Sequence, residues 1–233
     1  MVKRTVGLVL MTILMAFPLI SIASSFDVSH ATAYMLSYFT CGCSIEGTGA
    51  MTGRYGLITA AHNLYCQNHG KPLKGCLFYF GARKTENCFY EYSGGFSYTV
   101  YDTFQNGYSS KNDIGYIVFD TPVGDITGWF GVMYGYRPDS DDLELKNYSQ
   151  GGFLQSLRTY FDFEIEYVDG KQIRWPCVFY RWTTGGPIYS WPKGQDFPRI
   201  MAVYTATDNS DYSYGRLITE DIFFDMKADG ALE

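Results

Sequence analysis

The chain has 233 residues, a net charge of −6 at neutral pH and 46% hydrophobic residues. No cluster of lysine and arginine offsets this acidic balance, which argues against a surface that binds nucleic acid. The length fits one domain with a sizeable core. The 21 tyrosines, 17 phenylalanines and 25 glycines, with only 18% charged residues, favour an all-β fold of short strands joined by glycine turns.

Residues 1–23 predict a secretory signal peptide. Basic residues precede an apolar run over residues 6–20, and Ser21-Ile22-Ala23 then supplies small side chains at the two positions that signal peptidase recognises. The run is short for a membrane-spanning helix, and Pro18 interrupts it. We therefore expect cleavage after Ala23 and a secreted mature domain of residues 24–233 that no longer contacts a membrane.

Short runs rich in β-branched and aromatic residues predict strands along the rest of the chain. In chain order they are residues 57–61, 77–80, 96–101, 114–119, 160–168, 177–180 and 200–205. Asp169-Gly170 is a strong hairpin signal. Only residues 61–66, as a single turn, and residues 219–227, as a short C-terminal helix with Thr219 as N-cap, favour a helix. The one internal division we expect is the midpoint of a two-lobed β fold, near residues 133–147.

The six cysteines predict disulfides, because an exported chain folds in an oxidising compartment and its sequence shows no zinc-ligand spacing. Fifteen pairings are possible. The candidates are Cys41 or Cys43 with Cys66, and Cys76 with Cys88, which leaves Cys177 with the remaining partner or as a free buried thiol. We expect no metal ion and no cofactor.

Two residues have the setting that general-base chemistry requires. His62 follows the predicted strand at 57–61 in the string LITAAHN, so that a rigid strand end would fix its ring. Asp113 opens the string NDIGYIVFD, directly before an alternating apolar strand, where a carboxylate would be anchored. A lone histidine is more often structural than catalytic, as His30 and His69 illustrate, because both lie in polar surroundings without a motif.

Four stretches taken together resemble the His, Asp and nucleophile blocks of trypsin-like serine proteases. They are GTGAMTGRYGLITAAHN (47–63), NDIGYIVFD (112–120), TPVGDITGWFG (121–131) and TTGGPIY (183–189), and the third is most similar to the glutamyl endopeptidase branch. The resemblance covers the chain from about Tyr34 onward. It implies two antiparallel six-stranded β-barrels with a short C-terminal helix, at about residues 34–132, 148–218 and 219–227, and a triad in the cleft between them.

Residue by residue, the resemblance implies that His62 is the general base and Asp113 its orienting carboxylate. Thr184 takes the place of the nucleophilic serine, and the backbone N–H groups of Trp182 and Thr184 would form the oxyanion hole. Ser93-Gly94-Gly95 also looks like a nucleophile turn, but it precedes Asp113 and falls in the first barrel.

The chain departs from the family pattern where the chemistry is most demanding. Threonine at position 184 keeps the hydroxyl but adds a methyl group that restricts its rotamers, and Trp182 stands where a glycine is usual. In a second alignment, residues 183–186 match the stretch before the nucleophile, so that no nucleophile remains; the spacing to the following strand favours the first alignment. Tyr204 stands where the branch has a glutamate-binding histidine, so glutamate specificity is not expected.

Tyr204 and Thr205, with Trp191, are candidates for a neutral substrate pocket, although core packing is the commoner role for any one of them. Two functions therefore follow from the sequence. The first is a secreted serine-type endopeptidase with Thr184 as a compromised or adapted nucleophile. The second is an inactive protease homologue that binds a peptide or protein partner in the former cleft. In both cases we expect a monomer whose ligand is a peptide or protein.

Overall fold

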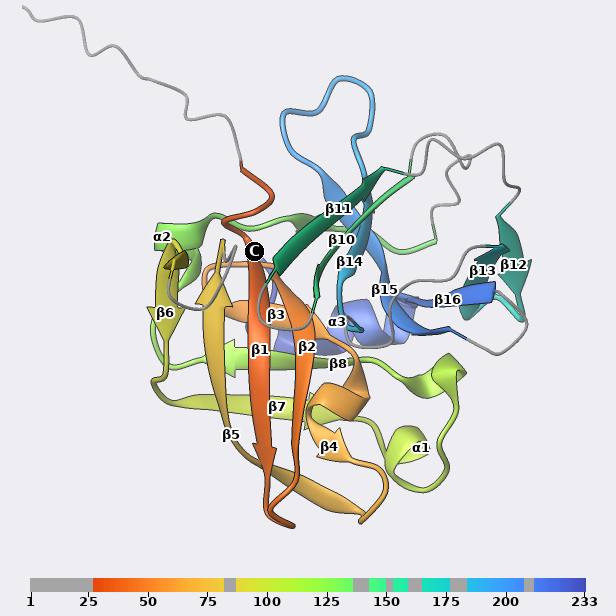
Figure 1. Cartoon of the computed structure of the whole chain (residues 1–233). Coiled ribbons are helices and arrows are strands. Elements are labelled where there is room, and N and C mark those ends of the chain that lie inside the picture. The colour runs from red at the N-terminus through yellow and green to blue at the C-terminus, as the bar shows by residue number, and fades with distance from the viewer. Residues whose placement is uncertain are drawn as a thin grey trace, which may run out of the picture.

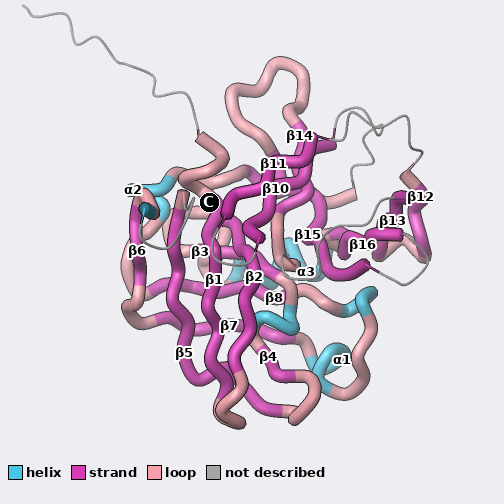
Figure 2. The backbone as a smooth tube through the Cα atoms, in the orientation of Figure 1, coloured by secondary structure: helices cyan, strands magenta, loops and turns pink. Residues whose placement is uncertain are grey.

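The computed structural model describes residues 27–81, 87–135, 143–149, 153–158, 165–176, 184–207 and 212–233. The predicted signal peptide, the predicted strand at 177–180, Cys177 and Trp182 lie outside these residues. Within them, no helix is both long and apolar enough to cross a membrane. Strands dominate the backbone, as Figure 2 shows.

The first half of the chain forms one sheet of eight antiparallel strands, in the order β4-β5-β1-β2-β3-β8-β7, with β6 paired to β5. The sheet curls, so that β7 and β8 run across β1 and β2 (Figure 1). Its strands are β1 (Thr32–Phe39), β2 (Ser44–Met51), β3 (Gly56–Thr59), β4 (Tyr65–Cys66), β5 (Lys71–Phe80), β6 (Tyr90–Tyr92), β7 (Phe96–Val100) and β8 (Gly115–Phe119).

The second half forms another eight-stranded sheet, in the order β11-β10-β14-β15-β16-β13-β12, with β9 paired in parallel to β15. Its strands are β9 (Gly131–Val132), β10 (Leu143–Ser149), β11 (Phe153–Arg158), β12 (Glu166–Val168), β13 (Gln172–Pro176), β14 (Pro187–Ser190), β15 (Arg199–Thr207) and β16 (Tyr212–Leu217). The expected all-β fold of two barrel-like sheets is confirmed. Among the described residues each sheet has eight strands, because short pairings such as β4 and β9 add to the longer strands.

Helical segments within the described ranges are few and short. They are η1 (Ala61–Asn63), α1 (Asp102–Gln105), η3 (Ser110–Asn112), α2 (Gly124–Thr127) and α3 (Glu220–Ala228). The predicted C-terminal helix is confirmed as α3. Thr219 occupies its N-cap position with extended backbone angles, but its side chain makes no capping hydrogen bond.

The hairpin signal at Asp169-Gly170 is confirmed between β12 and β13. Both residues have positive φ, 54° and 63°, and the N–H of Lys171 donates to the carbonyl of Val168 at 3.3 Å. Turns of this kind match the twist of the strands that they join.

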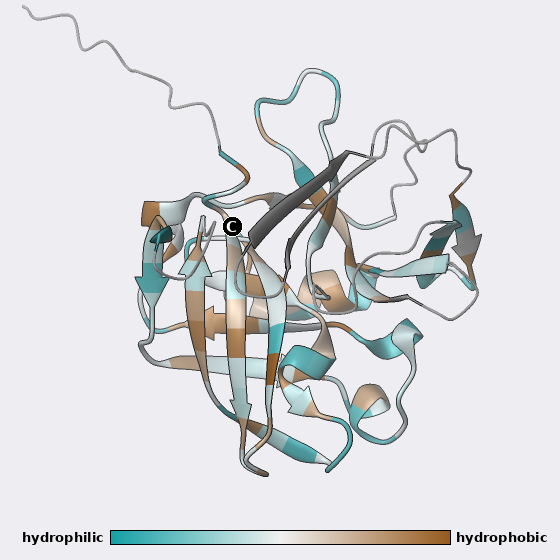
Figure 3. Ribbon diagram, in the orientation of Figure 1, coloured by the Kyte–Doolittle hydropathy of each residue, from teal (hydrophilic) through white to brown (hydrophobic). Residues whose placement is uncertain are grey.

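Aromatic side chains pack against one another in the core of the first sheet. The ring of Phe78 meets the rings of Phe96 and Phe119 edge-on, with centroids 5.5 and 5.0 Å apart, and Tyr92 meets Phe119 at 4.8 Å. Such edge-to-face pairs add stability beyond the burial of their surface. Figure 3 shows the corresponding hydrophobic stretches along β8 and its neighbours.

The C-terminal segment packs onto the first sheet and so joins the two halves of the chain. Ile222 and Met226 of α3 are buried in the core of the first sheet. The hydroxyl of Tyr116, on β8, donates to Asp229 at 2.6 Å, and Thr52 Oγ1 donates to the carbonyl of Ala231 at 2.8 Å. The sheet that contributes two of the predicted triad residues is therefore stabilised by the end of the chain.

None of the predicted disulfides is formed, because all five cysteines of the described residues are free thiols. Cys76 lies on β5 with its sulfur 3.5 Å from Ser37 Oγ, and burial raises the pKa of its thiol to about 12. Cys88 lies two residues before Tyr90, the first residue of β6, which pairs with Phe80 at the end of β5. Cys88 therefore lies beyond that end of β5, too far from Cys76 for a disulfide. Cys41, Cys43 and Cys66 lie close together without a bond.

The contact of the C-terminal segment with the first sheet can be tested at Gly56. A Cβ at this position would overlap the carbonyl of Ala231, so Gly56→Ala forces backbone atoms apart. We expect it to lower the free energy of unfolding by about 1–3 kcal/mol, the usual cost of overpacking. Gly75→Ala is the matched control, because nothing lies within 4 Å of a Cβ there. Equal urea denaturation midpoints for the two variants would contradict the contact.

Candidate active site

His62 and Asp113 are brought together by the pairing of two strands. His62 lies in η1, directly after β3, and Asp113 lies between η3 and β8. Strands β3 and β8 are antiparallel, with Thr59 opposite Gly115, so the end of one lies beside the start of the other. The two side chains therefore meet although they are 51 positions apart in the sequence.

The carboxylate of Asp113 holds the imidazole ring of His62 at two points. Its Oδ1 accepts from the backbone N–H of His62 at 2.9 Å, and its Oδ2 lies 2.7 Å from Nδ1 of the ring. Asp113 has no solvent exposure, and the His62 side chain is only 15% exposed. Because an ionised carboxylate can only accept, a ring with a single proton carries it on Nδ1 and keeps a lone pair on Nε2.

Thr184 completes the line from the other half of the chain. It lies in the turn before β14, and its Oγ1 is in hydrogen-bond contact with Nε2 of His62. Because Nε2 is the acceptor, the threonine hydroxyl donates. The three residues that the sequence singled out as a triad thus lie in one hydrogen-bonded line, Asp113–His62–Thr184.

The turn that carries Thr184 is hydrogen-bonded to both sheets. The carbonyl of Thr184 accepts from the N–H of Thr48, on β2, at 2.9 Å and from Nδ2 of Asn63 at 3.0 Å. On the other side, the N–H of Gly185 donates to the carbonyl of Tyr204, on β15, at 2.7 Å. These bonds fix the position of the threonine backbone relative to His62.

Glycine is the residue type that fits this turn at position 185. Its φ is 98°, in the region that favours glycine, and a Cβ there would overlap the carbonyl of Thr48 and the hydroxyl of Thr59. The close approach allows the turn to reach the first sheet, where Thr59 Oγ1 donates to the same Thr48 carbonyl at 2.6 Å.

Asn63 is a site residue that the sequence reasoning missed. It is fully buried, and its Nδ2 donates both to the Thr184 carbonyl and to Thr59 Oγ1, each at 3.0 Å. The available signal was a polar residue directly after His62 in an otherwise apolar string. Its partner lies 121 residues away, so only the folded chain shows its role.

One of the two expected oxyanion-hole donors lies within the described residues. The backbone N–H of Thr184 donates to no acceptor in the described part of the chain. The other expected donor, Trp182, lies outside the described residues.

A cleft of about 470 Å³ opens beside His62 and Thr184. Tyr204 and Thr205 line it as expected, but both are buried, and Tyr204 packs against Trp175 with ring centroids 6.3 Å apart. Trp191 does not line it and borders a separate hollow with Met133 instead, so its predicted place in the pocket is wrong. The lining is Phe39, Cys43, Ser44, Ile45, His62, Cys66, Gln67, Asn68, Tyr108, Thr184, Tyr204, Thr205 and Ala206.

No model of a known protein family matches the chain. No curated protein matches it either. Solved structures do match. A thermostable serine protease, AL20, from an extremophilic microorganism has a TM-score of 0.71 at 13% identity, covering 88% of this chain and 99% of that one. A Glu endopeptidase has a TM-score of 0.69 at 15% identity, covering 90% and 94%. The scabies mite inactivated protease paralogue S-I1 has a TM-score of 0.63 at 12% identity, covering 88% and 97%.

At these identities the similarity establishes the fold alone. The two curled, mostly antiparallel sheets and the short C-terminal helix α3 agree with that fold. The chain has the fold of the trypsin-like serine proteases.

Proposed function

We propose that the chain is an exported endopeptidase that hydrolyses peptide bonds with Thr184 as its nucleophile. The observation that carries this proposal is the hydrogen-bonded line from the buried Asp113 through His62 to the Thr184 hydroxyl. A nucleophile, a base and a group that orients the base, each within hydrogen-bond reach of the next, are what acyl transfer by a side-chain hydroxyl requires.

In the proposed reaction, Thr184 Oγ1 attacks the carbonyl carbon of the scissile peptide bond while Nε2 of His62 takes the hydroxyl proton. Asp113 stabilises the imidazolium that forms and keeps the ring in place. His62 then gives the proton to the leaving amine, which breaks the C–N bond and leaves an ester on Thr184. Water, activated by the same ring, hydrolyses the ester and restores the free hydroxyl.

The methyl group of Thr184 is the element that a serine would lack. Threonine has few accessible rotamers about its first side-chain torsion, so the contact of Oγ1 with His62 also fixes where the methyl lies. Since the approaching substrate must pass this carbon, we infer a slower attack than a serine at this position would give.

The cleft favours substrates with uncharged side chains. None of its described lining residues is a lysine, arginine, aspartate or glutamate. A pocket that binds a substrate carboxylate needs a cation or several donors directed at it, because burying an unpaired charge is costly. A glutamate preference, as in the Glu endopeptidase of the same fold, is therefore not part of this proposal.

A second candidate is an inactive homologue that holds a peptide in the cleft without cutting it. It is favoured by the tryptophan at position 182, where a bulky side chain replaces the glycine of the family pattern, together with the Thr184 methyl group. The scabies mite inactivated protease paralogue, which has the same fold, is a precedent for losing activity while keeping the architecture.

The nucleophile can be identified by covalent labelling. A fluorophosphonate probe should modify Thr184 of the purified mature protein, and Thr184→Ala should remove the label and all measurable peptide hydrolysis, since loss of a nucleophile costs on the order of a millionfold in kcat. Ser93→Ala is the control, because Ser93 is an exposed hydroxyl before two glycines but lies away from His62. Labelling that survives Thr184→Ala would contradict the assignment.

Thr184→Ser separates the two candidate functions. Serine keeps the hydroxyl beside His62 and removes the methyl group, so we expect casein hydrolysis to increase by roughly ten-fold or more, which corresponds to about 1.4 kcal/mol in the barrier. A Thr184→Ser protein that binds peptides but cleaves none would favour the inactive homologue.

Asn63 should act on the reaction by positioning Thr184. Asn63→Ala leaves the Thr184 carbonyl with one donor fewer, and the loss of a buried hydrogen bond costs about 1–3 kcal/mol. We expect kcat to fall by roughly 10- to 100-fold with a smaller change in KM. The exposed Asn106 provides the control, because Asn106→Ala should leave both constants unchanged. An unchanged kcat in Asn63→Ala would show that the hydrogen bond from Asn63 to the Thr184 carbonyl is not required for the reaction.

A further inference from the structure

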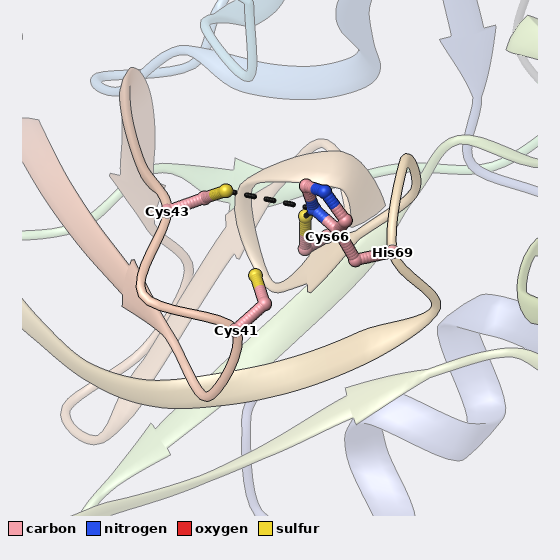
Figure 4. A group of neighbouring side chains, drawn as sticks. All are labelled: Cys41, Cys43, Cys66 and His69. Atoms are coloured by element: carbon pink, nitrogen blue, oxygen red, sulfur yellow. Dashed lines mark hydrogen bonds between the residues drawn. The ribbon is translucent and has the colours of Figure 1, made fainter.

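Three thiols and one imidazole converge on the rim of the cleft. Sγ of Cys41, Cys43 and Cys66 and a ring nitrogen of His69 all lie within 4.8 Å of one another. They come from two segments, the turn between β1 and β2 and the segment from Cys66, at the end of β4, to His69, and the four side chains point toward one another (Figure 4). The active-site line uses none of them.

The local backbone explains how two cysteines of one turn face the same point. Gly42, between Cys41 and Cys43, has a φ of 86°, which glycine adopts without strain. Its N–H donates to the carbonyl of Phe39 at 3.0 Å, and the N–H of Phe39 donates to the carbonyl of Cys43 at 2.9 Å. The turn is therefore closed on both sides, with its two thiols on the side of β4.

The second segment is equally short. His69 lies three residues after Cys66, and its backbone N–H donates to the carbonyl of Cys66, with 3.4 Å between nitrogen and oxygen. Gly70, with a φ of 59°, then turns the chain into β5. This arrangement directs Nδ1 of the His69 ring at the sulfurs, 3.4 Å from Sγ of Cys66 and 3.5 Å from Sγ of Cys43.

These separations fit a tetrahedral zinc site. With Zn–S bonds of about 2.3 Å and Zn–N bonds of about 2.0–2.1 Å, two ligands at the tetrahedral angle are about 3.6 Å apart for sulfur and nitrogen, and about 3.8 Å for two sulfurs. The two measured sulfur–nitrogen distances lie within 0.2 Å of that value. A set of three thiolates and one imidazole is one of the usual structural zinc ligand sets.

We propose that Cys41, Cys43, Cys66 and His69 bind one Zn²⁺ ion as a closed structural site. A disulfide between two of the cysteines, as the sequence first suggested, would leave a third thiol and an imidazole directed at it without a role. Zinc uses all four groups and has no redox chemistry of its own, so it also protects the thiols from oxidation in an exported protein.

The site would brace the cleft beside the base. Cys43 and Cys66 both line the cleft, and Cys66 lies four residues after His62. An ion bound here joins the tip of the β1–β2 hairpin to the segment that continues from His62. The site does not depend on whether Thr184 is catalytic, so it holds for either candidate function.

The sequence contains the site as two short ligand pairs, Cys-x-Cys at 41–43 and Cys-x-x-His at 66–69. The expectation of no metal was based on the lack of a zinc-ligand spacing in the sequence. It overlooked these pairs because the first is tighter than the usual spacing and 22 residues separate them. The fold brings them together through the pairing of β5 with both β1 and β4.

Metal content measured on the protein as purified, without added chelator or reductant, tests the proposal. We expect one zinc ion per chain by plasma mass spectrometry. Replacement by Co²⁺ should give the intense sulfur-to-metal charge-transfer band and the visible bands of a tetrahedral thiolate site. Because the cobalt spectrum is recorded on the unaltered chain, it does not depend on whether a variant folds.

Variants identify the ligands. Cys43→Ser and His69→Ala should each weaken zinc binding by more than roughly 100-fold in competition with a chromogenic chelator, beyond the 10- to 100-fold that outer residues cost. Cys88→Ser is the matched control, because Cys88 is a partly exposed thiol outside the cluster, and it should keep its zinc. A chain that binds neither zinc nor cobalt, and whose non-reduced peptide map shows a disulfide within residues 41–66, would overturn the proposal.

Discussion

The turn at Thr184–Gly185 is hydrogen-bonded to both sheets at once, and the site depends on this one constraint. The Thr184 carbonyl accepts from Thr48 and Asn63 on one side, and Gly185 donates to Tyr204 on the other. Buried hydrogen bonds of this kind are costly to leave unmade, so the turn cannot shift without breaking contacts to one sheet. The position of the Thr184 hydroxyl relative to His62 therefore follows from how the two sheets pack, and the end of the chain reinforces that packing through α3.

The same constraint bears on the choice between enzyme and inactive homologue. A chain that no longer used its hydroxyl would have no need to hold it against the base, yet Thr184, His62 and the fully buried Asp113 remain in line. The methyl group works against this arrangement by crowding the attack. The proposed function is thus an enzyme whose machinery is assembled and whose nucleophile is hindered, and the proposed zinc site would hold the neighbouring rim of the cleft rigid.

The sequence predicted the fold class from its short aromatic and β-branched runs. It brought out His62 and Asp113 because each adjoins a recognisable strand run, and the resemblance of the four stretches to a known family then added Thr184. The sequence did not predict strands β1 and β2. In β2 the glycines at 47 and 49 are needed for close approach, since a Cβ at Gly47 would overlap the Asn63 side chain and one at Gly49 would press on Leu57 and Met35. Glycine lowers the strand signal at the positions where the fold requires it. Asn63 and the cysteine–histidine cluster were missed for a related reason, because their partners are distant in the sequence and meet only through strand pairing.

The turn at Thr184–Gly185, held by hydrogen bonds to both sheets, presents the Thr184 hydroxyl to Nε2 of His62. An experimental crystal structure of the mature protein, with clear density for the Thr184 side chain, tests it most directly. We expect Oγ1 to lie within about 3.5 Å of Nε2, with the methyl group turned away from the ring. A threonine whose methyl faces His62, or a turn detached from Thr48 and Asn63, would contradict it.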